Sequence, residues 1–291
     1  MPTAAKTEVS TRRATPEDAA ICGQICYDAF AHISAQHNFA CDLPNAEAAV
    51  GFMKVLFSIP GFYCVVAELD GRLVGSNVLD ERSIIAGIGP ITIDPTVQNA
   101  GIGRRLMLKV LERAREQRAA GVRLVQAAFH NRSLSLYASL GFDVREPLSC
   151  IQGTPRERTV AGCVVRSATE ADLNFCNALS HRVHGFARAA ELAFAVERGT
   201  ALIVERGGRV TGYSSHLGFF GHTTCESNQD LQALLASADS YGGPGVLLPS
   251  RNTEMLRWCL ANGLRVTQPM TLMSMGLYNE PRGAWLPSIT F

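Results

Sequence analysis

The stretch of sequence that decides the fold is residues 84–106, IIAGIGPITIDPTVQNAGIGRRL. Its first ten residues are rich in β-branched side chains and predict a strand, but Gly89 and Pro90 interrupt that strand. Proline cannot donate to a sheet ladder, and glycine inside a strand often marks a bulge or a close backbone approach. We therefore expect two strands that part at this point and leave backbone groups open to a ligand.

An amphipathic helix is predicted directly afterwards, over residues 103–118, with Gly101 and Gly103 at its amino end. A helix start leaves backbone N–H groups without partners and carries positive potential, and glycine lets an anion come close. Arg104 adds positive charge. The sequence therefore predicts that the backbone of residues 98–104 holds a phosphate-bearing ligand.

Two familiar phosphate motifs do not fit this turn. No Gly-Lys-Ser/Thr follows it, so it is not a P-loop. In a dinucleotide fingerprint the third glycine would stand at position 106, which is Leu106. A nucleotide-binding Rossmann protein is accordingly a poorly supported interpretation.

Three separated motifs resemble the GCN5-related N-acetyltransferase (GNAT) superfamily. Gln98, Gly101 and Gly103 form the pattern Gln-x-x-Gly-x-Gly after an Asp-Pro strand end. Residues 130–142, HNRSLSLYASLGF, resemble the family's second motif, and residues 13–18, RATPED, resemble its first strand and helix. The resemblance covers residues 10–148, with the motifs in the family's order.

This resemblance implies an α/β fold with a central mixed, mostly antiparallel sheet flanked by helices. It also implies acetyl-CoA as co-substrate, and direct attack on the thioester by a primary amine of a small molecule or peptide in a ternary complex. The residues expected to bind acetyl-CoA are Ile91, Ile93, Gln98, Asn99, Ala100, Gly101, Ile102, Gly103, Arg104, Asn131, Ser133 and Tyr137.

Tyr137 is the expected proton donor to the departing thiolate, because family members place a tyrosine here; its alternative role is packing between Leu136 and Leu140. A tyrosine pKa near 10 and a thiol pKa near 8.5 make this transfer feasible. Asn131 matches the motif only with a slip of one residue, and His130 is the alternative.

No motif fixes the general base that takes the proton of the amine. Glu81 is our candidate, with Asp80 beside it, because both precede the interrupted strand. His32 and His37 are weaker candidates, since lone histidines are usually surface or core residues.

The chain repeats itself weakly. Residues 14–18, ATPED, return as ATEAD at 168–172, and the predicted hairpin at 65–75 returns at 202–212. We predict two GNAT-like domains in tandem, over 1–150 and 163–291, joined by a linker at 151–162.

The second domain is expected to be degenerate. Its shorter spacing predicts the loss of a helical segment, and the counterpart of the phosphate turn is expected at residues 235–240, which contain no glycine. Cys259 is the counterpart of Tyr137. We therefore expect no coenzyme site in the second domain.

Composition narrows the remaining classes. The 291 residues are 47% hydrophobic and 18% charged, with 27 basic against 26 acidic side chains and a net charge of +1. Such a chain has ample core material and no charge-driven attraction to nucleic acid or membrane. No apolar run approaches the ~18 residues of a membrane span, and the polar amino terminus predicts no secretory signal, so we expect a cytoplasmic protein.

Nine cysteines occur without a CxxC pair, and we expect buried thiols rather than a metal site or disulfides. Cys22 and Cys26 are four apart, which places both on one face of a helix.

The leading function is an N-acetyltransferase, and the alternative is an acyl-CoA-binding sensor without turnover. Tyr137 favours the enzyme, while the acceptor, acyl chain length and oligomeric state stay open.

Overall fold

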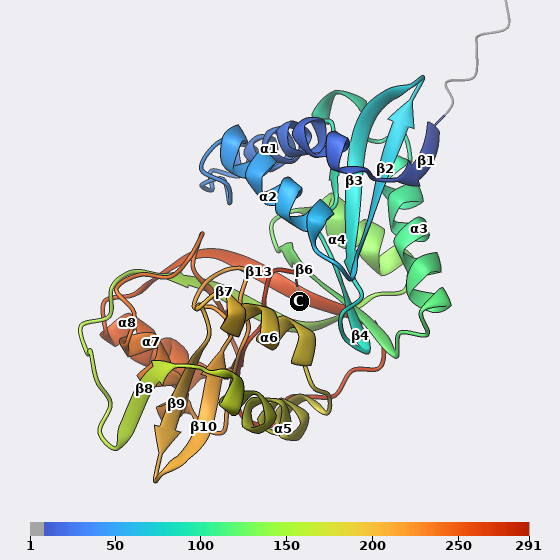
Figure 1. Ribbon diagram of the computed structural model, residues 1–291. Helices are drawn as coiled ribbons and strands as arrows, with labels where there is room; N and C mark the ends of the chain where they lie inside the picture. The colour runs from blue at the N-terminus through green and yellow to red at the C-terminus, as the bar shows by residue number, and fades with distance from the viewer. Residues whose placement is uncertain (1–8, 291) are drawn as a thin grey trace, which may run out of the picture. The chain divides into compact units, whose positions relative to one another are not determined.

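The computed structural model describes residues 9–290, which form two compact units (Figure 1). The first unit contains the residues up to 81 together with 86–119, and the second contains 82–85 and the residues from 120 onward. The sequence placed the boundary at 151–162 instead, and the strand pairing of the second unit explains the difference. Residues 1–8, part of the amino terminus in which no secretory signal is expected, lie outside the described residues.

The first unit is built on antiparallel strands. Strand β1 (Val9–Arg13) pairs with β2 (Phe62–Leu69), and β2 pairs with β3 (Arg72–Asp80). The predicted hairpin between β2 and β3 is confirmed: Asp70 and Gly71 form its turn with φ of 51° and 78°. Two successive positive φ angles match the right-handed twist of the flanking strands. On its other edge, β3 pairs with β4 (Ile85–Ile88) and β5 (Thr92–Ile93).

Three helices cover this sheet. Helices α1 (Ala19–Gln36) and α2 (Ala46–Ser58) lie on one side of β2 and β3, and α3 (Ile102–Glu116) lies on the other (Figure 1). Cys22 and Cys26 pack with α2 and β2 in one apolar cluster, so the expected burial of both thiols on one helix face is confirmed. Burial raises the pKa of the Cys22 thiol to about 12, which keeps it protonated at neutral pH.

The second unit contains a five-stranded antiparallel sheet in the order β14-β11-β10-β9-β8. Its strands are β8 (Cys163–Ser167), β9 (Leu202–Arg206), β10 (Arg209–Ser214), β11 (Thr223–Cys225) and β14 (Ala284–Leu286). Helices α5 (Leu173–His184) and α6 (Ala189–Glu197) pack with Ile203 and Tyr213, while α7 (Asn228–Ala236) packs with Val204 and Cys225. Because neighbouring strand residues point to opposite faces, the helices cover both sides of the sheet.

Four further strands of this unit pair antiparallel in the order β6-β13-β7-β12. They are β6 (Gly121–Ala127), β7 (Asp143–Gln152), β12 (Val246–Pro249) and β13 (Arg265–Gly276). Helix α4 (Asn131–Ser139) joins β6 to β7, and α8 (Thr253–Ala261) joins β12 to β13. Each half therefore gives its last strand to the other half: β13 pairs with β6, and β7 pairs with β12. This exchange places β6, α4 and β7 in the same unit as the second half.

The elements follow the same order in both halves, which confirms the predicted tandem α/β fold. The first half runs β1, α1, α2, β2, β3, β4 and β5, α3, β6, α4, β7. The second half runs β8, α5, α6, β9, β10, β11, α7, β12, α8, β13. A short 3-10 turn precedes the first helix of each half, at Pro16–Asp18 and Glu170–Asp172.

Two expectations about the second half were wrong. No helical segment is lost, because α7 occupies the place of α3; it has 9 residues against 15. The second half is shorter mainly because its helices α5, α6 and α7 have fewer residues than α1, α2 and α3. Residues 235–240 are not the counterpart of the phosphate turn, since α7 ends at Ala236 and the corresponding turn precedes Asn228.

All nine cysteines are free thiols, and seven of them are buried. Across residues 9–290, none of the helices combines the length and apolar character that a membrane crossing needs.

Candidate active site

The predicted strand interruption is present in the first unit. Strand β4 ends at Ile88 and β5 begins at Thr92, and both pair with β3. Between them, the N–H of Gly89 donates to the carbonyl of Val78 at 2.9 Å, with Gly89 at φ 135°. Pro90 and Ile91 fall in the gap between the two registers, where β3 offers them no pairing partner. The predicted interruption of the strand at Gly89 and Pro90 is therefore confirmed.

A compact turn connects β5 to α3. The Asp94 carboxylate accepts hydrogen bonds from the Thr96 backbone at 2.9 Å and hydroxyl at 2.7 Å, and from Arg72 at 2.7 Å. Burial alone would raise the pKa of Asp94, but these hydrogen bonds outweigh it and lower the pKa. The Gln98 amide donates to the carbonyl of Ile93 at 3.2 Å, so it fixes the turn against the end of β5.

Gly101 is the residue at which the chain enters α3. Its φ is 78°, and a Cβ built there would meet no heavy atom within 4 Å among the described residues beyond its chain neighbours. Ile102 and Gly103 follow in the first helical turn, where backbone N–H groups have no intrahelical partner. The turn thus combines open space, bare amides and the positive end of a 15-residue helix.

The side chains beside the turn either extend into solvent or make hydrogen bonds that hold the fold together. Asn99, Ala100 and Arg104 are exposed, and Asn99 has a φ of 69°. Arg105 donates to the carbonyl of Val9 at 2.6 Å, so its guanidinium is used to attach α3 to β1.

Glu81, the candidate base, follows β3 and is ion-paired. Its carboxylate accepts from Nε of Arg113 at 2.5 Å and from Nη2 at 3.0 Å. The Arg113 guanidinium also lies 5.3 Å from the centre of the Tyr63 ring. The hydrogen bonds to Glu81 raise the pKa of Arg113, which therefore stays charged. His32 and His37, the weaker candidates, lie in and directly after α1 and are exposed.

The remaining predicted residues lie in the second unit, on α4. His130 caps this helix: its Nδ1 accepts from the Ser133 N–H at 3.4 Å. The Ser133 hydroxyl bonds Gln126 and the His130 carbonyl, both at 2.8 Å, so it already has two partners. Asn131 is exposed. His130, and not Asn131, therefore takes the capping position of α4.

Tyr137 is buried on α4 and meets the ring of Phe142 edge-on, with 6.2 Å between the ring centres. Burial raises the pKa of the Tyr137 phenol above its usual value. The phenol consequently keeps its proton through the neutral and moderately alkaline range. In the second half Cys259 stands at the same place in α8, as predicted.

The sequence analysis missed Gln126, which interrupts the apolar run of β6. Its side chain is buried, its Oε1 accepts from Ser133, and its Nε2 has no partner among residues 9–290. A buried amide with unused N–H donors is costly unless something else accepts from them. A polar residue inside an apolar strand was the available signal.

A second group that the sequence did not single out is a buried chain of polar side chains in the second half. The Nδ1 of His222 lies 2.8 Å from Glu191, and its Nε2 lies 2.9 Å from the Tyr213 hydroxyl. Arg188 donates to Glu191 at 2.8 Å. Burial would raise the pKa of Glu191, but Arg188 and His222 lower it, so the carboxylate stays ionised. Its negative charge is paired with the positive charge of Arg188.

The predicted site residues therefore fall into two groups. Residues 91–104 and Glu81 belong to the first unit, and Asn131, Ser133 and Tyr137 belong to the second. Within the described chain, no group of three or more His, Cys, Asp or Glu side chains is arranged to hold a metal ion.

Part of this sequence is similar to known proteins. The profile of the Acetyltransferase (GNAT) family matches residues 27–142, which hold both the turn before α3 and Tyr137. Residues 27–142 belong to the GNAT acetyltransferase family. The uncharacterized N-acetyltransferase YjgM of Escherichia coli K12 is 26% identical over 117 residues, covering 38% of this chain and 70% of YjgM.

Solved GNAT structures match nearly the whole tandem fold. A candidate acetyltransferase from Pyrococcus horikoshii has a TM-score of 0.72 at 18% identity, covering 98% of this chain and 96% of its own. A GCN5-related N-acetyltransferase from Sphaerobacter thermophilus has a TM-score of 0.62 at 15% identity, covering 93% and 96%. A tandem GNAT protein from the clavulanic acid biosynthesis pathway has a TM-score of 0.56 at 15% identity, covering 92% and 98%. At these identities the likeness establishes the GNAT fold over both halves.

Proposed function

We propose that this protein is an N-acetyltransferase that moves the acetyl group of acetyl-CoA to a primary amine of a small molecule or peptide. The observation that carries the proposal is the turn at Gly101, where a positive φ, open space and the start of α3 coincide. Its position inside the GNAT-matched region, residues 27–142, supports the same conclusion.

The first task of the site is to hold a diphosphate. The N–H groups of Ile102 and Gly103 belong to the first turn of α3, and an anion placed there gains both hydrogen bonds and the helix dipole. A side chain at Gly101 would enter the open space in front of this turn. The residues present thus fit the coenzyme, since the backbone itself supplies the contacts from 98 to 104.

The second task is to stabilise the acyl transfer. Acetyl-CoA supplies the thioester carbonyl that the amine attacks and the thiolate that leaves. A backbone N–H of Ile91 or Ile93, at the interruption of the strands, donates to the carbonyl oxygen as negative charge builds on it. Tyr137 donates its phenolic proton to the departing sulfur.

The third task is to remove the proton of the incoming amine, which we assign to Glu81. Two hydrogen bonds from Arg113 hold this carboxylate in a fixed orientation. To accept a proton, Glu81 must exchange one of these two hydrogen bonds for the amine. Asn131 and Ser133 complete the proposed set as coenzyme contacts, and the second half is proposed to bind no coenzyme.

The test combines binding with turnover. Calorimetry with coenzyme A measures binding, and the release of free thiol is followed with acetyl-CoA and a panel of amino acids, polyamines, aminoglycosides and peptides. Thiol release above background with one class of amine is the expected result. Coenzyme A binding without thiol release across the panel would instead indicate an acyl-CoA sensor, and no binding would refute the proposal as a whole.

A further inference from the structure

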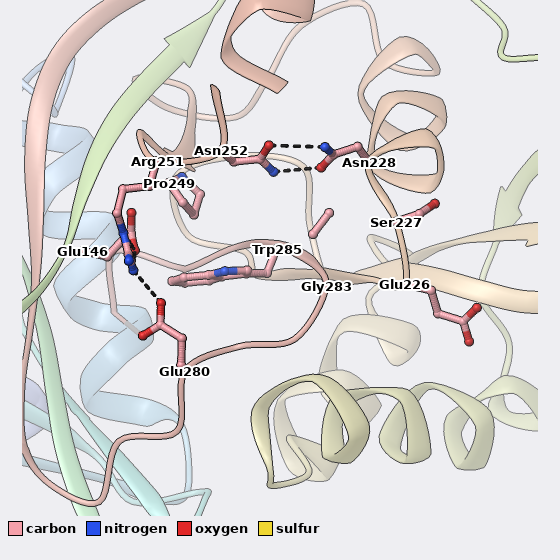
Figure 2. Close-up of a pocket in the computed structure, with 11 residues that line it drawn as sticks. Glu146, Glu226, Ser227, Asn228, Pro249, Arg251, Asn252, Glu280, Gly283 and Trp285 are labelled. Atoms are coloured by element: carbon pink, nitrogen blue, oxygen red, sulfur yellow. Dashed lines mark hydrogen bonds and ion pairs between the residues drawn. The ribbon is translucent and has the colours of Figure 1, made fainter. Parts of the chain in front are cut away.

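The second unit contains a solvent-open pocket of about 470 Å³ that the proposed acetyl transfer does not use (Figure 2). Its lining comes from the start of α7, the connection from β12 to α8, strand β7 and the segment that leads into β14. The side chains that matter below are Glu146, Glu226, Arg251, Glu280 and Trp285.

The repeat relates this pocket to the phosphate turn of the first half. Asn228 begins α7 as Ile102 begins α3, and Asn252 caps α8 as His130 caps α4. Asn228 and Asn252 donate to each other at 3.3 Å and 2.8 Å, so they tie the starts of the two second-half helices together (Figure 2).

The start of α7 cannot receive a phosphate in the way proposed for α3. Ser227 caps it with its own side chain, accepting from the Asp230 N–H at 3.4 Å and donating to the Asp230 carboxylate at 2.5 Å. Asp230 is buried and ionised in the first turn, where Arg206 and neighbouring hydroxyls lower its pKa against burial. The anion site of the first half is thus replaced by fixed negative charge.

The charge of the pocket itself is also negative. Arg251 bonds both Glu146 and Glu280, so two carboxylates share one guanidinium. Glu226 does not add to this excess, because Arg182 at 3.0 Å and Arg209 at 2.7 Å neutralise it, and its side chain points away from Trp285 (Figure 2). Among the side chains that line this end of the pocket, the two carboxylates of Glu146 and Glu280 thus outnumber the one guanidinium of Arg251.

Glu146 is the residue that points to a ligand. It is only 2% exposed, and while its Oε2 accepts from Arg251, its Oε1 has no hydrogen-bond partner among residues 9–290. Leaving a buried carboxylate oxygen without a donor destabilises the folded protein. A ligand that offers an N–H to this oxygen would remove this destabilisation.

Trp285 adds an aromatic surface beside this oxygen. It lines the pocket, and its ring meets His184 edge-on with 5.7 Å between the ring centres. A tryptophan face attracts a cation, and a carboxylate beside it adds charge and a hydrogen-bond acceptor.

From this arrangement we propose that the pocket binds the ammonium group of a small organic amine, with Glu146 Oε1 accepting one N–H and Trp285 contacting the cation. The one carboxylate in excess of the guanidinium and the single unused oxygen match one ammonium group. This site is independent of the proposed acetyl transfer and needs no coenzyme.

The experiment uses the full chain and two probes of equal shape, n-butylamine and n-butanol, with binding measured by calorimetry. Glu146→Gln keeps the size of the side chain and removes its charge, and we expect at least a tenfold loss of n-butylamine affinity. Glu226→Gln is the matched control in the same pocket, and it should bind n-butylamine as the wild type does. n-Butanol should not bind to the wild type or to either of these two variants.

A second variant covers the case in which Glu146→Gln fails to fold. Glu280→Gln leaves the ion pair between Arg251 and Glu146 in place but removes the second carboxylate, so it should also weaken n-butylamine binding. Trp258→Phe leaves Trp285 as the single tryptophan of the chain, and its fluorescence should then change with n-butylamine. Equal binding of n-butanol, no heat with n-butylamine, or unchanged affinity in both glutamate variants would overturn the proposal, whatever the outcome of the acetyl-transfer assays.

Discussion

Arg166 holds Asp172 with two parallel hydrogen bonds, from Nη1 at 2.8 Å and Nη2 at 2.9 Å, and also bonds Glu205 on the neighbouring strand. The first half repeats the same arrangement 154 positions earlier, where Arg12 bonds Asp18 at 2.7 Å and 2.9 Å and also bonds Glu68. The repeat is thus preserved in side-chain contacts as well as in the order of elements. In both halves this ion pair fixes the capping turn before the first helix.

The ion pair predicts a pH dependence of stability. Burial would raise the pKa of Asp172, but Arg166 and the Thr169 capping bonds lower it well below the ordinary value. A carboxylate whose folded pKa lies below its unfolded pKa, near 3.9, stabilises the fold above that pH and loses the contribution as the pH falls towards the folded pKa. Asp172→Asn should therefore cost about 1–3 kcal/mol at pH 7 and progressively less below pH 4.

Urea unfolding at a series of pH values measures this difference. Glu197→Gln, at an exposed carboxylate on the last residue of α6, is the control and should keep the pH profile of the wild type. A constant gap between Asp172→Asn and wild type down to pH 3 would contradict the assignment.

Gly101 and Gly71 offer a matched pair for testing the coenzyme turn. Both have a φ of 78°, and in both a Cβ would meet open space, so a valine should strain the two positions equally, by about 1–2 kcal/mol. Gly101→Val should weaken coenzyme A binding at least tenfold, because its side chain enters the space before α3. Gly71→Val, in the hairpin between β2 and β3, should lose similar stability and keep coenzyme A affinity. Calorimetry and thermal unfolding on both variants separate the two effects, and equal affinities would refute the site.

The parts of this site that lie in one stretch of sequence were predictable. Gly89 and Pro90 break a strand through their own chemistry, and Gly101 begins a helix, so their roles follow from local pattern. The contact between Glu81 and Arg113 joins residues 32 positions apart, one directly after a strand and the other on a helix. Neither segment contains a local pattern that predicts a contact between the two residues.

The exchange of β7 and β13 was not predictable for a similar reason. Apolar strands such as β6 and β13 pair well with many neighbours, and the sequence does not rank them. The misplaced start of α7 is different, since Ser227 followed by Asp230 is an N-cap signal that stood in the sequence. The spacing between repeats pointed to residues 235–240 instead.

Tyr137→Phe tests the proposed acid. The substitution keeps the buried ring and its contact with Phe142, so thermal stability and coenzyme A affinity should change little. Loss of the phenolic proton should lower kcat by about 10²–10⁴-fold. Because burial raises the pKa of Tyr137, wild-type kcat should show no decline from deprotonation of this group up to about pH 10. Unchanged kcat in Tyr137→Phe would contradict the assignment of Tyr137 as the acid, whereas a decline near pH 9 that disappears in Tyr137→Phe would contradict only the raised pKa.

Glu81→Gln tests the proposed base against a purely structural role. As the base, Glu81 should be needed for kcat, and its loss should lower kcat about 100-fold. Arg113→Lys keeps a positive charge beside Glu81 and should retain most activity. If Glu81→Gln lowers the unfolding temperature alone and leaves kcat intact, the carboxylate serves only its ion pair with Arg113.

The exchange of last strands predicts that the halves do not fold separately. A fragment ending at residue 152 contains β6 and β7 but lacks β13, which pairs with both of them from Arg265 to Gly276. The fragment also lacks β12, so one edge of β6 and both edges of β7 are left without a partner, and Met270 and Leu272 are missing from the apolar cluster. Exposed strand edges of this kind aggregate. The fragment 1–152 alone should therefore give little soluble, folded protein. Co-expression with the fragment 153–291 should restore both solubility and coenzyme A binding, as measured by gel filtration and calorimetry of the purified pair. A monomeric, cooperatively unfolding 1–152 fragment would contradict the exchange and would restore the domain boundary expected at residues 151–162.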